Sequence, residues 1–298
     1  MRGTHLNGLE GTNPFGFLAA LGVQELFKES PEGPALWWTD ATVPQARTDF
    51  TVDAIVEQAM MQFPQWANHR ALNPNIDPKA DRSAKFRDSD IRRYLNLTQN
   101  GRPGSAFATA LLAEGSLDSK GVAKPTDLYF TAGRLLFVRI AREILLHADE
   151  ESIRNALDGP WQSREVSSLG WDPAGYIPYS LAPTKPGTGK KEAYVGVEAL
   201  AILGMSRHPV FCGPKRTLTQ GCSGSWSNTQ YTWPLWRRPS GYNVVSSLLT
   251  HARSSAHRIP AKWFKGWGVS MVLKSQIRRT RGQGGGLFTP SEIIWPTE

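Results

Sequence analysis

With 298 residues, the chain is long enough to bury a sizeable core without disulfide or metal support. Two cysteines that form no zinc-binding pair, and no apolar run of membrane-span length, favour a cytoplasmic protein over an exported or membrane-inserted one. The formal net charge of +8 is concentrated in residues 205–298, which contain 13 Lys and Arg but only 2 Asp and Glu. A surface so poor in carboxylates attracts a polyanion such as a phosphate backbone.

The first half of the chain is predicted to be mainly helical. Its first helix has a clear start, because Asn13 can cap it and Pro14 suits the first helical position. Gly16 and Gly22 predict close packing of this helix against another backbone. The next helix is expected to stop at Pro64. Apolar residues at helical spacing predict helices over 52–63, 88–95, 106–113 and 132–147.

The short helix expected near residues 88–95 carries two cations. Asp88 or Ser89 could cap it. Arg92 and Arg93 are displayed on it and are candidate phosphate contacts.

The second half is rich in Gly, Pro, Ser, Thr and Trp, and helical periodicity weakens in it. Short strands such as 231–233 are predicted, with one helix over 197–205 that contains an echo of residues 18–22. The fold class is therefore α+β. A helical or mixed region, 1–155, is followed by a basic region, 156–298, and the two can share one core.

No catalytic constellation is found. Residues 184–191 superficially suggest a phosphate-binding loop, but two of its four fixed positions fail. His251 and His257 have no nearby carboxylate, and Glu292 and Glu298 are the only acidic residues of the most basic region. We expect no catalytic residues, metal or cofactor. A site assembled from distant residues would escape this search and remains the enzyme alternative.

The basic region interleaves cations with aromatic rings, a combination suited to single strands or an opened duplex. Tryptophans beside prolines are more often buried anchors, so most of these rings are expected inside and most of the cations outside. A cationic run before a glycine-rich stretch is the best single candidate segment, and its alternative is a disordered surface loop. Asn228 and Gln230 are candidate base contacts. The candidate cations of the region are Lys215, Arg216, Arg237, Arg238, Lys262, Lys265, Lys274, Arg278, Arg279 and Arg281.

Several stretches are similar, in the same order, to the large-subunit family of type I CRISPR effector (Cascade) complexes, particularly the I-G (formerly I-U) type. They are residues 6–22, 85–95, 171–173, 197–204 and 233–236. The resemblance implies a non-catalytic subunit of an antiviral defence complex that binds guide RNA (crRNA) and target DNA. It also implies help in recognising the protospacer-adjacent motif, contacts with the other effector subunits, and recruitment of a separate helicase-nuclease. The alternatives are a nuclease with a dispersed metal site and a free-standing nucleic-acid-binding protein.

Overall fold

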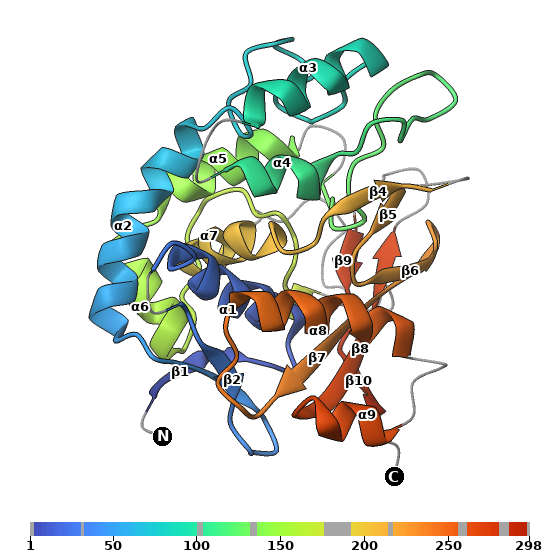
Figure 1. Cartoon of the computed structure of the whole chain (residues 1–298). Helices are drawn as coiled ribbons and strands as arrows, with labels where there is room; N and C mark the ends of the chain where they lie inside the picture. Colours follow the sequence, from blue (N-terminus) through green and yellow to red (C-terminus); the bar gives the residue numbers. More distant parts are fainter. Residues whose placement is uncertain are drawn as a thin grey trace, which may run out of the picture.

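The structure is a computed structural model that describes residues 3–30, 33–99, 104–131, 136–175, 192–213, 217–255, 261–279 and 286–296. Two helices in which every residue is buried form its centre, α1 (Pro14–Leu26) and α7 (Val195–Met205). Other helices surround this pair on one side and a β-sheet lies on the other (Figure 1). Helices predominate in the first half and strands in the C-terminal region, which confirms the α+β class.

The central helices touch backbone to backbone, as the glycines of the first helix predicted. A Cβ added to Gly22 would lie 1.8 Å from the Leu200 carbonyl oxygen, and one added to Gly204 would lie 1.9 Å from that of Leu18. Only glycine allows so close an approach. The two similar sequence stretches, 18–22 and 200–204, therefore contact each other reciprocally.

The outer helices confirm most of the predicted segments, although α6 was not predicted and the helix expected from residue 132 begins at Phe137, with 132–135 outside the described residues. Two further details differ. α2 continues past Pro64. Proline has no N–H to donate to the Met60 carbonyl, but Met60 is exposed, so water can reach this carbonyl. Burial of Trp66 stabilises the turn that follows the proline. Neither Asp88 nor Ser89 caps the third helix, whose N-cap is Arg87. The outer helices of the first half are α2 (Val52–Asn68), α3 (Asp88–Thr98), α4 (Ser105–Leu111), α5 (Phe137–His147) and α6 (Glu150–Asp158).

A small antiparallel sheet in the first half was not predicted. Its order is β1-β3-β2, and its strands are β1 (Thr4–Glu10), β2 (Leu36–Trp38) and β3 (Gln45–Thr48). Two of the strands are too short to display an alternating pattern, so tertiary contacts decide their conformation. This sheet packs against α6 and α1 and brings Trp38 against Phe17 of the central helix, with ring centroids 5.7 Å apart.

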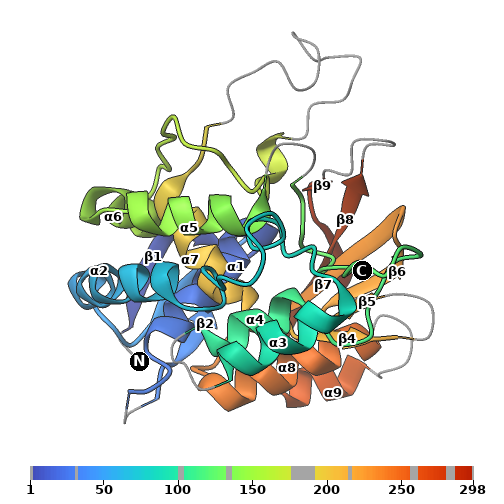
Figure 2. The same cartoon turned by 90° about the horizontal axis from the view of Figure 1, so that it is seen from above.

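The C-terminal region forms a five-stranded antiparallel sheet with the order β10-β8-β7-β6, in which β9 also pairs with β8. Two helices pack on it, α8 (Tyr242–Ser255) on β7 and α9 (Ala261–Gly266) on β8, and they lie together along one side (Figure 2). Both helices were missed from the sequence. The strands are β6 (Cys222–Ser225), β7 (Asn228–Trp236), β8 (Val269–Arg279), β9 (Gly286–Phe288) and β10 (Glu292–Trp295). A separate pair consists of β4 (Val210–Cys212) and β5 (Thr217–Thr219), and a 3₁₀ turn spans Pro173–Gly175.

One cluster of buried apolar residues runs from Leu6 to Phe288 and joins the two regions. The boundary expected near residue 155 falls inside α6, which packs on both α7 and β1. Neither Cys212 nor Cys222 forms a disulfide. In the part of the chain that the structure describes, no helix has the length and apolar character needed to cross a membrane.

Candidate nucleic-acid interface

Successive side chains of β7 and β8 point to opposite sides, so the pair has an apolar face and a mixed face that is buried at Pro234 and Val272 and polar toward the β6–β7 turn. Tyr231 and Trp233 are fully buried on the apolar face. The Trp233 indole N–H donates to the Gly11 carbonyl at 2.8 Å, and its ring lies 6.0 Å from that of Phe17. These contacts fix the apolar face against the central helices, so the residues between them must face the other way.

Five polar residues of this second face are at least partly exposed. Lys274, Gln276 and Arg278 alternate along β8, and Gln230 pairs with Gln276 across the sheet. Asn228 lies on the same side, because its Oδ1 accepts a hydrogen bond from Gln276 Nε2 at 3.0 Å. We call these five residues the polar face. It brings together four residues that were predicted separately, two as phosphate contacts and two as base contacts.

The polar face carries two cations, Lys274 and Arg278. Asn228 and Arg278 are exposed, and the side chain of Lys274 is 27% exposed. Lys274 Nζ lies 3.2 Å from Glu292 Oε2, but the Glu292 side chain is 72% exposed, and an ion pair so accessible to water contributes less than about 1 kcal/mol. A phosphate can therefore compete with this carboxylate.

Arg279, although predicted as a phosphate contact, points to the opposite side from Arg278. One guanidinium nitrogen donates to the Asp127 carbonyl at 2.5 Å and another to Thr229 Oγ1 at 3.2 Å. The guanidinium also lies 3.8 Å from the ring centroid of Trp226. Arg279 thus ties the sheet to the segment around Asp127, which is a positioning role.

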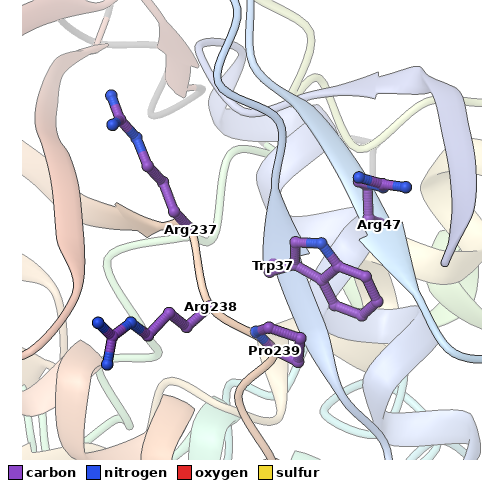
Figure 3. A pocket seen from close by; sticks show the side chains of 5 residues that line it. All are labelled: Trp37, Arg47, Arg237, Arg238 and Pro239. Atoms are coloured by element: carbon purple, nitrogen blue, oxygen red, sulfur yellow. The ribbon is translucent and has the colours of Figure 1, made fainter. Parts of the chain in front are cut away.

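Two further predicted cations, Arg237 and Arg238, lie at the other end of β7. With Trp37, Arg47 and Pro239 they line an open hollow of about 630 Å³ (Figure 3). The side chains of Arg237 and Arg238 extend to one side of Trp37 and that of Arg47 to the other, so the three guanidinium groups do not converge on one point.

Several contacts in and beside this hollow already engage its arginines. An Arg237 guanidinium nitrogen pairs with Asp40 Oδ1 at 2.6 Å, and Arg47 donates to the Gly3 carbonyl at 3.2 Å. Lys265, another predicted cation, is exposed on α9. Gly268 links it to Arg238, because the Gly268 N–H donates to the Lys265 carbonyl and the Arg238 side chain lies close to Gly268. These cations form a second basic area, separate from the polar face.

The remaining predicted cations do not join either area. Arg92 and Arg93 are exposed on α3, well apart from β7 and β8 in Figure 1. Arg92 is paired with Glu114, which reduces its availability. Lys215, Arg216 and Arg281, as well as the side chain of Lys262, lie outside the described residues.

Buried ionisable groups occur where α1, α7 and α8 meet, and their contacts are structural. Arg207 donates to Gln24 Oε1 at 3.0 Å and to the Tyr242 carbonyl at 2.7 Å, while its guanidinium lies 3.5 Å from the Tyr242 ring centroid. The Tyr242 hydroxyl donates to Glu25 Oε2 at 2.9 Å. Burial raises the pKa of Glu25 and lowers that of Arg207. This cluster joins the end of α1 to the start of α8.

His208, fully buried next to this cluster, is a second structural group. Burial lowers its pKa to about 4, with a smaller contribution from the charge of Arg207. One ring nitrogen lies 3.1 Å from the Gln220 carbonyl and the other 3.0 Å from the Tyr231 hydroxyl. The neutral imidazole therefore links the chain after α7 to strand β7. Within the described residues, no group of three or more His, Cys, Asp or Glu side chains could hold a metal ion.

Trp226 is the main residue that the sequence reasoning missed. It occupies the two-residue turn between β6 and β7 and is 52% exposed, whereas Trp233 and Trp236 are fully buried as expected. A signal was available in the sequence. Ser225 and Ser227 flank this tryptophan, and a large ring between small polar residues at a hairpin turn has no core to enter.

The comparisons with known proteins add no relative: a scan against protein-family models finds no match, and no curated protein matches the chain.

Proposed function

We propose that the protein is a non-catalytic, nucleic-acid-binding subunit of an RNA-guided type I CRISPR interference complex. In this role it binds guide RNA or target DNA, helps to recognise the protospacer-adjacent motif, and recruits a separate helicase-nuclease. The observation that carries the nucleic-acid part of the proposal is the polar face, a rigid sheet surface on which Lys274 and Arg278 lie beside three amide side chains.

The chemistry of the polar face supports this role in two ways. Lys274 and Arg278 are four residues apart on one strand, so their α-carbons are separated by about 13 Å, and each can neutralise a different phosphate of one backbone. The amides of Asn228, Gln230 and Gln276 carry donors and acceptors, the combination that recognises base edges, and a base would compete with the bond between Gln276 and Asn228. Phosphate attraction and base contact are therefore available on one surface.

Support for a role within a guide complex comes from the family resemblance described above. Sequence discrimination in such complexes is carried mainly by RNA–DNA pairing, so a subunit needs a backbone-binding surface and no catalytic centre. The carboxylate-poor C-terminal region suits that division of labour, because two-metal nuclease chemistry requires several convergent carboxylates.

Purification of the protein with the products of its neighbouring genes tests the complex. We expect a discrete guide RNA and further subunits to co-purify, and a CRISPR array and a helicase-nuclease gene to lie beside the gene for this chain. Absence of guide RNA from such a preparation, together with binding of nucleic acid by the chain alone, would indicate a free-standing binding protein instead. Metal-dependent cleavage by the pure chain, lost on mutation of an acidic cluster, would indicate a nuclease.

A further inference from the structure

The turn between β6 and β7 holds Trp226 in one position on the surface. Gly224 has a φ of +89°, and a Cβ at this residue would lie 2.1 Å from the Asn228 carbonyl oxygen, so the hairpin closes as tightly as glycine allows. Thr229 Oγ1 donates to the Ser225 carbonyl at 2.9 Å, and the hydroxyl oxygens of Ser225 and Ser227 lie 3.4 Å apart. These contacts define the path of the backbone on both sides of Trp226.

One face of the Trp226 ring is already occupied. The Arg279 guanidinium lies 3.8 Å from the ring centroid, and it donates to the Asp127 carbonyl, to Thr229 Oγ1 and, at 3.4 Å, to the carbonyl of Trp226 itself. A cation held by hydrogen bonds beneath an indole fixes the plane of the ring. Because Arg279 covers one face, the 52% exposure of Trp226 must come from the opposite face and the ring edge.

Among the tryptophans whose side chains the structure describes, Trp226 is the only exposed one. The sheet residues Trp233 and Trp236 are fully buried and donate their indole N–H groups to carbonyls. A flat partner that covers the open face of the Trp226 ring would bury apolar surface that is exposed in the folded protein. Burial of that surface favours binding.

We propose that Trp226, supported by Arg279, is a stacking platform for an unpaired base, so the nucleic acid bound by the polar face is single-stranded where it crosses the β6–β7 turn. This inference rests on the proposed nucleic-acid function and specifies the kind of strand. Two observations favour a base over an apolar protein segment as the occupant. The supporting group is a cation, and residues 205–298, which contain both Trp226 and Arg279, include only two acidic residues, which suits a polyanion.

The position of the platform fits this occupant. Trp226 precedes Asn228 by two residues, and their α-carbons are therefore within about 7 Å. Arg279 holds the ring on the side of the sheet opposite to Arg278, so a strand stacked on Trp226 reaches the polar face by passing around the β6–β7 turn. Stacking tolerates any base, so the platform contributes affinity for single strands and little sequence preference.

Fluorescence anisotropy with labelled RNA and DNA oligonucleotides tests the platform, on the purified full chain or its complex. Trp226→Ala is expected to weaken binding of a single strand by between about 5-fold and about 100-fold, with Trp226→Phe closer to the wild type. Because stacking releases no counterions, the dependence of the affinity on salt should stay unchanged. Duplex binding should change much less than single-strand binding. Phe211→Ala is the matched control, since Phe211 is 51% exposed on β4 and is not part of this turn.

The outcomes separate this inference from the proposed function. If the wild type binds single strands and Lys274→Glu/Arg278→Glu weakens that binding while Trp226→Ala does not, the platform is refuted and the polar face stands. Equal loss with single strands and duplex, or a loss of self-association in sedimentation instead of nucleic-acid binding, also refutes it. A wild type that binds neither strand refutes the proposed function itself. Thermal unfolding of Trp226→Ala near the wild-type temperature excludes a folding defect as the cause.

Discussion

Titration of His208 predicts a specific loss of stability in mild acid. Burial lowers its pKa to about 4, whereas an unfolded histidine has a pKa of about 6.5. Below pH 6.5 the unfolded chain therefore binds a proton that the folded chain excludes, and the free energy of unfolding falls until the pH reaches about 4. From pH 7.5 to pH 5.0, the difference between the two pKa values lowers the free energy of unfolding by about 2 kcal/mol from this residue alone.

The assay is urea unfolding of the wild type and of His208→Gln at both pH values. The variant loses the Tyr231 and Gln220 contacts and is less stable at pH 7.5, but it lacks the titrating group. The fall in unfolding free energy from pH 7.5 to pH 5.0 should therefore be about 2 kcal/mol smaller in the variant than in the wild type. Carboxylates such as Glu25 titrate in both proteins and cancel in this difference. Equal falls in the two proteins would show that His208 is not held neutral by burial.

Two further predictions concern the central contacts. Gly22→Ala should destabilise the fold by about 3 kcal/mol or more, because the added Cβ meets the Leu200 backbone. Gly241→Ala is the control: a Cβ there has nothing within 4 Å, and the free energy of unfolding should change by less than about 0.5 kcal/mol. Equal effects of the two substitutions in urea unfolding would contradict the close crossing of α1 and α7. Arg207→Ala should lower the free energy of unfolding by about 3 kcal/mol, because it removes the cation of a buried cluster. Lys28→Ala should lower it by less than about 1 kcal/mol, because the Lys28 side chain is 37% exposed. Similar losses of stability in both variants would show that burial does not set the contribution of this cluster.

Local sequence signals predicted most helices of the first half, although not α6. The start of α1 follows from Asn13, whose side chain accepts a hydrogen bond from the Phe15 N–H at 2.9 Å. The glycines of the same helix predicted the backbone contact that Gly22 makes with α7. In both cases the backbone of α1 restricts which residue fits, at its N-cap and at its close contact. Such a residue can be recognised in the sequence before the packing partner of the helix is known.

Elements that depend on distant partners could not be predicted in the same way. α8 is rich in Ser, Thr and Val, which are weak helix formers, and it is helical because Val245, Leu248 and Leu249 bury one stripe beside β7. Pro64 ended the predicted helix, but packing of Trp66 carries α2 beyond it. Here tertiary burial outweighs local propensity.

The candidate site was partly predictable for the same reason. The composition of the last third indicated cations and amides, but strand register decides which of them share a face. A shift of one residue separates Arg278, on the polar face, from Arg279, which the fold uses beneath Trp226. Sequence alone could not distinguish these adjacent arginines, because their difference arises from the buried residues of β7 and β8.

The salt dependence of single-strand binding by Lys274→Glu/Arg278→Glu tests the central claim most directly. Arg279 is left intact in this variant because it holds the fold together. If both cations contact phosphates, the affinity should fall, and the slope of log K against log salt should become shallower by about 1.4, since each phosphate contact contributes about 0.7 for a single strand. Lys79→Glu/Lys85→Glu, an equal charge change at exposed residues ahead of α3, controls for net charge. An unchanged slope in the sheet variant, or the same change in the control, would contradict the account.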